Sequence, residues 1–210
     1  MTTPLPFPLR SICALWHVGT LNLADKSRGS HEGAGLSVSL HPDAWRVIAR
    51  GRVRGDDWTL SKPDGQFLDY HELSDTHLEQ ITHWGVANGY VEHRTLYQAT
   101  WFDDELDSEL MSLHLTCEEA EDECSDPDSV QELPARLVPT AKLKTRVNGD
   151  APLVLVPDLL ATVFAEDVLN VDGVWWEDRL DVYAYSAPRG VISATKLPSW
   201  QISLARGEVA

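Results

Sequence analysis

Hydrophobic and polar residues alternate in two short stretches near the start of the chain. In SICALWHV, residues 11–18, the alternation predicts a strand that ends at His17, beside a Gly-Thr turn. In GLSVSL, residues 35–40, the apolar residues point to one face and Ser37 and Ser39 to the other. The sequence between them, LNLADKSRGSHEGA, has no apolar period and predicts a loop.

Further along, the pattern predicts three helices and several strands. One helix begins at Pro42, a second is capped by Ser74 and ends at Asn88-Gly89, and a third begins at Pro157 in VPDLLATVFAEDVL. FLDYHEL, YVEHRTLYQATWF, DGVWW, DVYAYSA and RGVISATKL predict strands, and RLVPTAKLKTRV predicts an extended segment. These elements predict an α+β fold with a mixed, mostly antiparallel sheet and a few short helices.

The charge of the chain is concentrated in one segment. The 210-residue chain carries a net charge of −16, and residues 101–133 hold thirteen acids without a lysine or arginine. We therefore expect one domain, residues 1–210, with an acidic insertion or loop at about 102–133. A solvated, partly disordered loop is one interpretation of it, and a docking surface for a basic protein is another. So little basic charge argues against nucleic acid as the main partner.

Other features of the sequence restrict the class of protein. No apolar run approaches the roughly 18 to 20 residues that span a bilayer, and MTTPLPFPLR is unlike a signal peptide, so we expect a cytoplasmic protein. The three cysteines are an odd number without zinc-site spacing: Cys13, Cys117 and Cys124. Three histidines recur every six residues, a spacing that scatters them around a helix instead of placing them on one face. No metal site is therefore expected from His71, His77 and His83.

The usual catalytic motifs are absent, but three segments resemble a known family. WHVGT, GAGL and DGVWWEDRL resemble the His-Gly-Thr strand, the Gly-Leu bend and the late Gly-Val-Trp strand of the RNA 2′-phosphotransferases. More broadly, they are similar to the diphtheria-toxin-like class of ADP-ribosyltransferases. The resemblance implies an ADP-ribosyltransferase-like fold with a cleft for NAD, as substrate, or for ADP-ribose.

The resemblance also implies roles for particular residues. His17 would bind a ribose hydroxyl and act in catalysis, and the backbone at Gly19 and Thr20 would approach the ligand. Small polar contacts behind the nicotinamide would come from Ser37 and Ser39. A pyrophosphate would meet Arg189.

A carboxylate is needed near the charge that develops when nicotinamide leaves. Glu177 directly follows the strand in GVWWED and is the favoured candidate, whereas Glu166 falls in the last turn of a predicted helix. A second group of acids follows the long strand, namely Asp103, Asp104 and Glu105. The aromatic ring that stacks on nicotinamide would come from one of three tyrosines, Tyr70, Tyr90 or Tyr97.

Three functions remain open on these grounds. The first is an NAD-using ADP-ribosyltransferase, of a toxin-like or other kind, or an NAD glycohydrolase, with an unknown acceptor. The second is a non-catalytic acidic protein that binds a basic partner through residues 101–133. RNA phosphate transfer comes third, because the family places arginine and other basic residues after the Gly-Leu bend, where this chain reads SVSLHPDAW, and because Val18 interrupts the His-Gly-Thr sequence.

Overall fold

The computed structural model describes residues 6–21, 35–43, 55–124, 129–147, 153, 157–179 and 186–205. Within these ranges the chain forms eleven strands in two sheets, together with four α-helices, which is an α+β fold. All strand pairs are antiparallel except that of β5 with β9, so the predicted fold class is confirmed. None of the helices in these ranges is long and apolar enough to cross a membrane.

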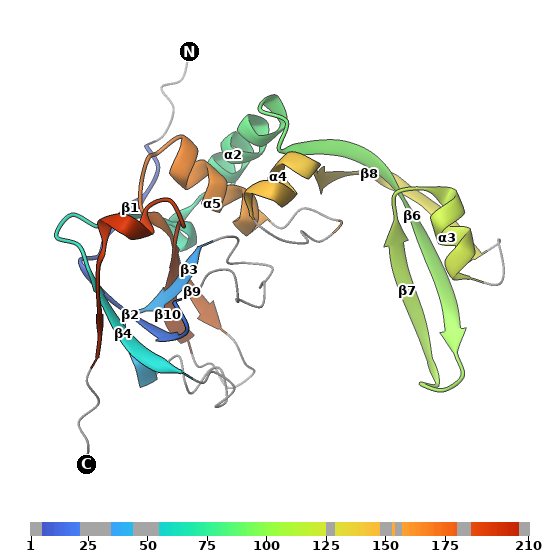
Figure 1. Ribbon diagram of the computed structural model, residues 1–210. Helices are drawn as coiled ribbons and strands as arrows, with labels where there is room; N and C mark the ends of the chain where they lie inside the picture. The colour runs from blue at the N-terminus through green and yellow to red at the C-terminus, as the bar shows by residue number, and fades with distance from the viewer. Residues whose placement is uncertain are drawn as a thin grey trace.

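The larger sheet has eight strands in the order β1-β5-β9-β10-β3-β2-β4-β11. Strands that are far apart in the chain are neighbours here, since β9 and β10 lie between β5 and β3 (Figure 1). The bounds of the strands are β1 Leu9–Ser11, β2 Ala14–Gly19, β3 Leu36–Ser39, β4 Asp56–Ser61, β5 Gln66–Asp69, β9 Gly173–Arg179, β10 Ser186–Ile192 and β11 Gln201–Leu204.

One face of this sheet is covered by helices. Helix α2, Asp75–Ala87, contacts α5, Pro157–Asp167, and α5 contacts β9. Val174 and Trp176 of β9 belong to the apolar cluster that these helices bury, together with Leu143 of α4, Ala141–Arg146. We call this group the helix-side cluster.

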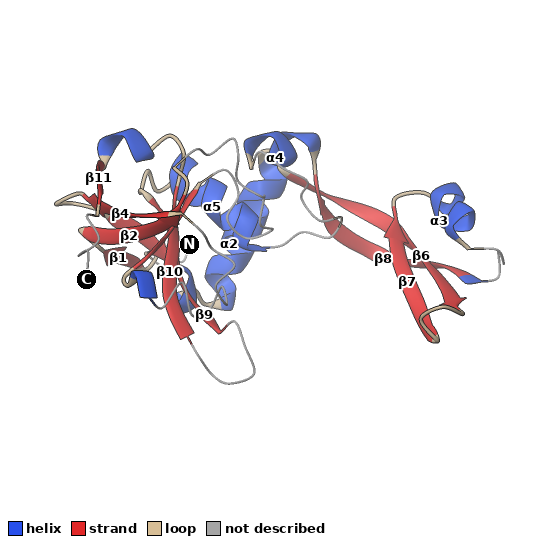
Figure 2. Ribbon diagram, turned by 60° about the horizontal axis from the view of Figure 1, so that its bottom comes forward, coloured by secondary structure: helices blue, strands red, loops and turns tan. Residues whose placement is uncertain are grey.

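The other face of the sheet encloses its own core. Leu15 of β2, Leu60 of β4, Phe67 of β5 and Trp175 of β9 pack in one buried cluster, the inner cluster. These strands are spread across most of the sheet, so their side chains can meet only because the sheet is strongly twisted and curved (Figure 2). The predicted alternation along DGVWW is confirmed, because Trp175 lies in the inner cluster while its neighbours face the helices.

A buried ion pair joins Lys62, which precedes β5, to Asp172, which directly precedes β9. The Asp172 carboxylate, with its side chain 3% exposed, accepts hydrogen bonds from Lys62 Nζ at 2.6 Å, from the Gln66 backbone N–H at 2.8 Å and from Trp200 Nε1 at 3.3 Å. Trp200 follows the 3₁₀ turn η4, Leu197–Ser199, so one carboxylate ties the start of β9 to three other parts of the chain.

The smaller sheet projects from the body as an arm (Figure 1). It has the order β7-β6-β8, with β6 Val91–Asp103, β7 Ser108–His114 and β8 Val130–Pro139. Helix α3, Cys117–Glu123, packs on one side of it, where Ala120 and Cys124 contact Ala99. The acidic segment seen in the sequence therefore includes most of the outer part of this arm.

Three local predictions were wrong. RGVISATKL is a strand only as far as Ile192, where β10 ends, and a turn follows. In FLDYHEL the strand ends at Asp69, and Tyr70–Glu72 form the 3₁₀ turn η2 that leads into α2. In RLVPTAKLKTRV the strand ends at Pro139 and α4 follows, because Ala, Lys and Leu favour helix once the strand pairing stops. Most of the predicted helix after Pro42 and most of the predicted strand DVYAYSA lie outside the described residues.

Candidate functional site

The three segments that carry the family resemblance come together in the larger sheet. WHVGT lies in β2 and the start of the following turn, GAGL leads into β3, and DGVWWEDRL lies mostly in β9. The strand order β9-β10-β3-β2 places them side by side, with only β10 between β9 and β3. Segments that are distant in the sequence thus form one continuous region of the sheet.

A row of paired residues crosses this region. Trp176 of β9 pairs with Arg189 of β10, which pairs with Ser39 of β3, and Ser39 pairs with Trp16 of β2. The Arg189 guanidinium lies over the Trp176 ring, 5.2 Å from its centroid. Because paired residues in a sheet share a face, this row lies on the side of the helix-side cluster.

Strands β2 and β3 diverge next to this row. They share one pair of residues, whereas β2 and β4 are paired over six. Beyond Trp16 the contact between β2 and β3 is made by the His17 ring, whose Nδ1 lies 2.8 Å from the backbone oxygen of Ser37. Its Nε2 lies 2.9 Å from the backbone oxygen of Thr20. His17 is 6% exposed, so its ring is held between the diverging strands.

The two contacts of His17 have a chemical consequence. A carbonyl oxygen can only accept, so both contacts are hydrogen bonds only when both ring nitrogens carry a proton. The ring is therefore held from both sides by backbone oxygens, that of Ser37 at Nδ1 and that of Thr20 at Nε2.

The turn after His17 has the backbone conformation that only glycine adopts readily. Gly19 has a φ of 127°, and a Cβ on Gly55 would lie 2.8 Å from the Gly19 Cα, so the two segments touch through their backbones. Trp58 of β4 pairs with His17, and its indole Nε1 donates to the Gly19 oxygen at 2.9 Å. Trp58 is therefore the aromatic residue beside His17.

Sequence analysis missed Trp58 because it did not predict β4. The signal was present in DDWTLS, where Trp58 and Leu60 alternate with polar residues as the buried side of a strand. Asp56 and Asp57 at its start, next to the Gly55 bend, obscured the pattern, because a run of Gly and Asp is typical of a loop.

The predicted serines and His17 do not share a face. Leu15 and His17 are on the same side of β2, and Leu15 belongs to the inner cluster. Ser37 and Ser39 alternate with Leu36 and Val38 of that cluster, so their side chains point to the opposite side. Ser39 Oγ donates to the His41 oxygen at 3.0 Å. The serines thus contact the His17 region through backbone, and their hydroxyls lie on the face that holds Arg189.

Glu177 is placed by the backbone alone. It lies on β9 and pairs with Pro188 of β10, one position beyond the row that contains Trp176 and Arg189. Strand β9 is three strands from β2, which on a flat sheet corresponds to about 14 Å. Trp175 of β9 and Leu15 of β2 belong to the same inner cluster, which continues between them through Ile192 of β10 and Leu36 of β3.

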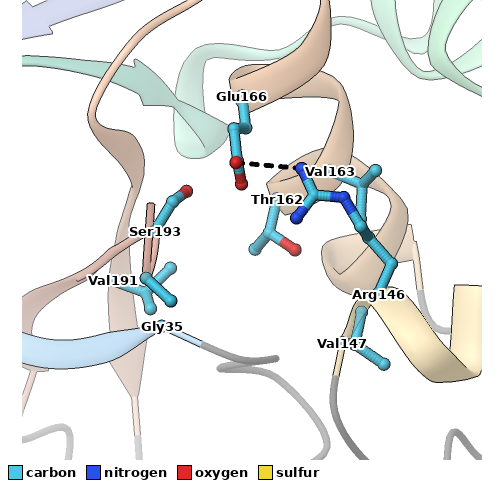
Figure 3. A pocket seen from close by; sticks show the side chains of 9 residues that line it. Gly35, Arg146, Val147, Thr162, Val163, Glu166, Val191 and Ser193 are labelled. Atoms are coloured by element: carbon cyan, nitrogen blue, oxygen red, sulfur yellow. Dashed lines mark ion pairs between the residues drawn. The ribbon is translucent and has the colours of Figure 1, made fainter. Parts of the chain in front are cut away.

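Glu166, the other carboxylate near this region, lines a small pocket and is held by structural partners. Arg146 of α4 lies 2.9 Å from Glu166 (Figure 3) and 2.8 Å from Asp167, and the Thr195 hydroxyl also donates to Glu166. The cavity volume is about 30 Å³, room for about two or three water molecules. It is too small for a nucleotide, so Glu166 serves to attach α4 to α5.

The three candidate tyrosines make contacts elsewhere in the fold. Burial and the neighbouring Asp158 raise the pKa of Tyr70. Tyr90 donates to Asp167 at 2.8 Å and stacks on Trp84, and Tyr97 packs in the arm. The acids Asp103, Asp104 and Glu105 lie at the tip of the arm, where Asp103 accepts the backbone N–H groups of Glu105 and Leu106.

Comparisons with known proteins do not identify this site. No protein-family model, no curated protein and no solved structure matches the chain. Among the described residues, no group of three or more His, Cys, Asp or Glu side chains is arranged to hold a metal ion.

Proposed function

We propose that this protein binds NAD where β2 and β3 diverge and releases nicotinamide, passing the ADP-ribosyl group to an acceptor or to water. The observation that carries the proposal is the position of the three family-like segments in one region of the sheet. Two lie in the neighbouring strands β2 and β3, with the His17 ring between them, and the third lies in β9, separated from β3 by β10. Three weak sequence similarities gain weight when folding makes them neighbours.

The contacts of His17 suit the ribose half of such a ligand. The ring holds the backbone of Ser37 through Nδ1 and that of Thr20 through Nε2, and the ribose would lie against this fixed backbone. Trp58 offers an aromatic surface beside His17, and the glycine conformation at Gly19 allows close approach of the ligand to backbone.

The reaction needs one bond to break and one to form at the same carbon. The bond between the anomeric ribose carbon and the nicotinamide nitrogen breaks, and its electron pair leaves with nicotinamide. The sugar becomes oxocarbenium-like, an acceptor nucleophile or water attacks it, and the nucleophile loses a proton. Glu177 is the carboxylate that we assign to the stabilisation of the developing positive charge.

The first experiment is thermal unfolding of the purified chain with NAD and, separately, with ADP-ribose. A ligand at about 100 times its dissociation constant adds about 2.7 kcal/mol to the free energy of unfolding, which shifts the midpoint by several degrees. His17→Ala should lose most of this shift. Trp58→Phe, which lacks the indole N–H, should weaken it while keeping an aromatic ring.

Nicotinamide release then separates binding from chemistry. Glu177→Gln should keep the NAD shift and lose most of the release, while Glu79→Gln, an exposed change of the same kind on α2, should alter neither. Absence of any thermal shift with both ligands, in a chain that unfolds cooperatively, would refute NAD binding. A normal rate of release in Glu177→Gln would refute the assigned carboxylate alone.

A further inference from the structure

The arm has one covered face and one open face. Along β6 the residues Tyr97, Ala99 and Trp101 point toward α3 and form a small buried cluster with it. Strand alternation places the residues between them on the other side. Among the described elements, the outer part of the arm makes appreciable contact only with its own three strands and α3.

The open face carries three exposed apolar side chains. Phe102 of β6 is 59% exposed, and Met111 and Leu113 of β7 are 69% and 37% exposed. Met111 pairs with Thr100 and Leu113 pairs with Gln98. Both therefore lie on the same side of the sheet as Phe102, the side opposite α3. Apolar side chains grouped in this way on a projecting sheet are typical of a protein contact.

The charge around this face indicates what covers it. Between Arg94 and Arg136 the chain has thirteen acids and no lysine or arginine. Glu109 lies on the open face itself, and Asp103, Glu105 and Asp107 surround the exposed Leu106 at the tip. An occupant must therefore supply both apolar contacts and positive charge.

We propose that the open face of the arm, Phe102, Met111 and Leu113 with Glu109 at its border, binds a partner protein through a segment that combines lysine or arginine with apolar side chains. A second copy of the chain fits less well, because its arm would bring thirteen more acids. Nucleic acid and anionic lipid are repelled for the same reason.

The experiment uses the methyl group of Met111 as a probe. The chain has two methionines, Met1 and Met111, so ¹³C-methyl-methionine labelling gives an NMR signal on the open face that Met111→Leu identifies. The titrants are three short synthetic peptides of alternating residues, lysine with leucine, lysine with serine, and glutamate with leucine. The lysine-leucine peptide should shift the Met111 signal saturably and leave the Met1 signal unchanged.

Matched variants test the two components of the surface. Leu113→Ser should weaken binding of the lysine-leucine peptide about tenfold, while Leu9→Ser, a change at an exposed leucine on β1, should not. Glu109→Gln should reduce the salt dependence of binding more than Glu118→Gln on α3.

Three results would overturn the proposal. The first is no shift of Met111 with the lysine-leucine peptide, and the second is an equal shift with lysine-serine or glutamate-leucine. The third is a Met111 signal that changes with protein concentration alone, which would identify a second copy as the occupant. Each readout is independent of NAD, so failure here and failure of the nucleotide site are distinguishable.

Discussion

Asp172 offers the sharpest test of how the larger sheet is held together. Its carboxylate is 3% exposed and receives Lys62 Nζ at 2.6 Å, the Gln66 N–H at 2.8 Å and the Trp200 indole at 3.3 Å. Asp172→Ala removes all three interactions and leaves the partly buried Lys62 ammonium without its counter-charge. Loss of one partner of a buried, hydrogen-bonded ion pair costs about 3 to 5 kcal/mol, and we expect about 4 kcal/mol.

The effect should be larger than that of changing the other partner. Lys62 is 21% exposed, and Lys62→Met leaves the carboxylate with two N–H donors, so we expect a loss of about 2 kcal/mol. Asp64→Ala, at an exposed position of the same turn, should change stability by less than about 0.5 kcal/mol.

Urea unfolding followed by tryptophan fluorescence measures these differences, provided that the denaturant slope stays constant across the variants. A loss below about 1 kcal/mol in Asp172→Ala would refute the view that this ion pair fastens β9 to β5. It would also weaken the case that the strand bearing Glu177 is held in a fixed position.

Three further predictions concern single contacts. Tyr90→Phe should lose about 1 kcal/mol at neutral pH, because Tyr90 donates to Asp167 at 2.8 Å. Burial, and then the hydrogen bond to Asp167, raise the pKa of Tyr90. The contribution of Tyr90 to the free energy of unfolding is therefore present below about pH 10 and is lost as the pH rises further. Unfolding measured as a function of pH should show this alkaline loss in the wild type and less of it in Tyr90→Phe. Gly19→Ala should lower stability by about 1 to 3 kcal/mol through strain at a φ of 127°, and an unchanged unfolding midpoint would contradict this. Ser74→Ala should cost about 1 kcal/mol and reduce amide protection in the first turn of α2, because Ser74 and His77 form its capping box.

Local patterns predicted many of the elements but not all their ends. Ser74 and Asn88-Gly89 were predicted to bound a helix, and α2 has those bounds because capping is a short-range interaction. The alternation in GLSVSL was likewise confirmed as β3. The segment after Pro139 was misjudged as extended, since neighbouring residues alone do not show where strand pairing ends.

The acidic segment shows a different limit of sequence analysis. Its charge suggested a solvated loop. In the structure, Ala99 and Trp101 of β6 and Leu110 of β7 lie on one side of two paired strands, the side that α3 covers. Strand β6 pairs with both β7 and β8, so the acids of this segment lie largely on paired strands and on α3, which local composition does not predict.

The sequence by itself determined the α+β class, the position of the acidic charge and the three short segments that suggest an NAD-using protein. These depend on periodicity, composition and local motifs, which act over a few residues. The tertiary structure decided which of the candidate residues meet. In it, His17 lies beside Trp58 and the backbone of Ser37, and the hydroxyls of Ser37 and Ser39 lie on the opposite face of the sheet. Glu166 forms an ion pair with Arg146. Such contacts depend on strand order and on the curvature of the sheet, which arise from the packing of the whole core.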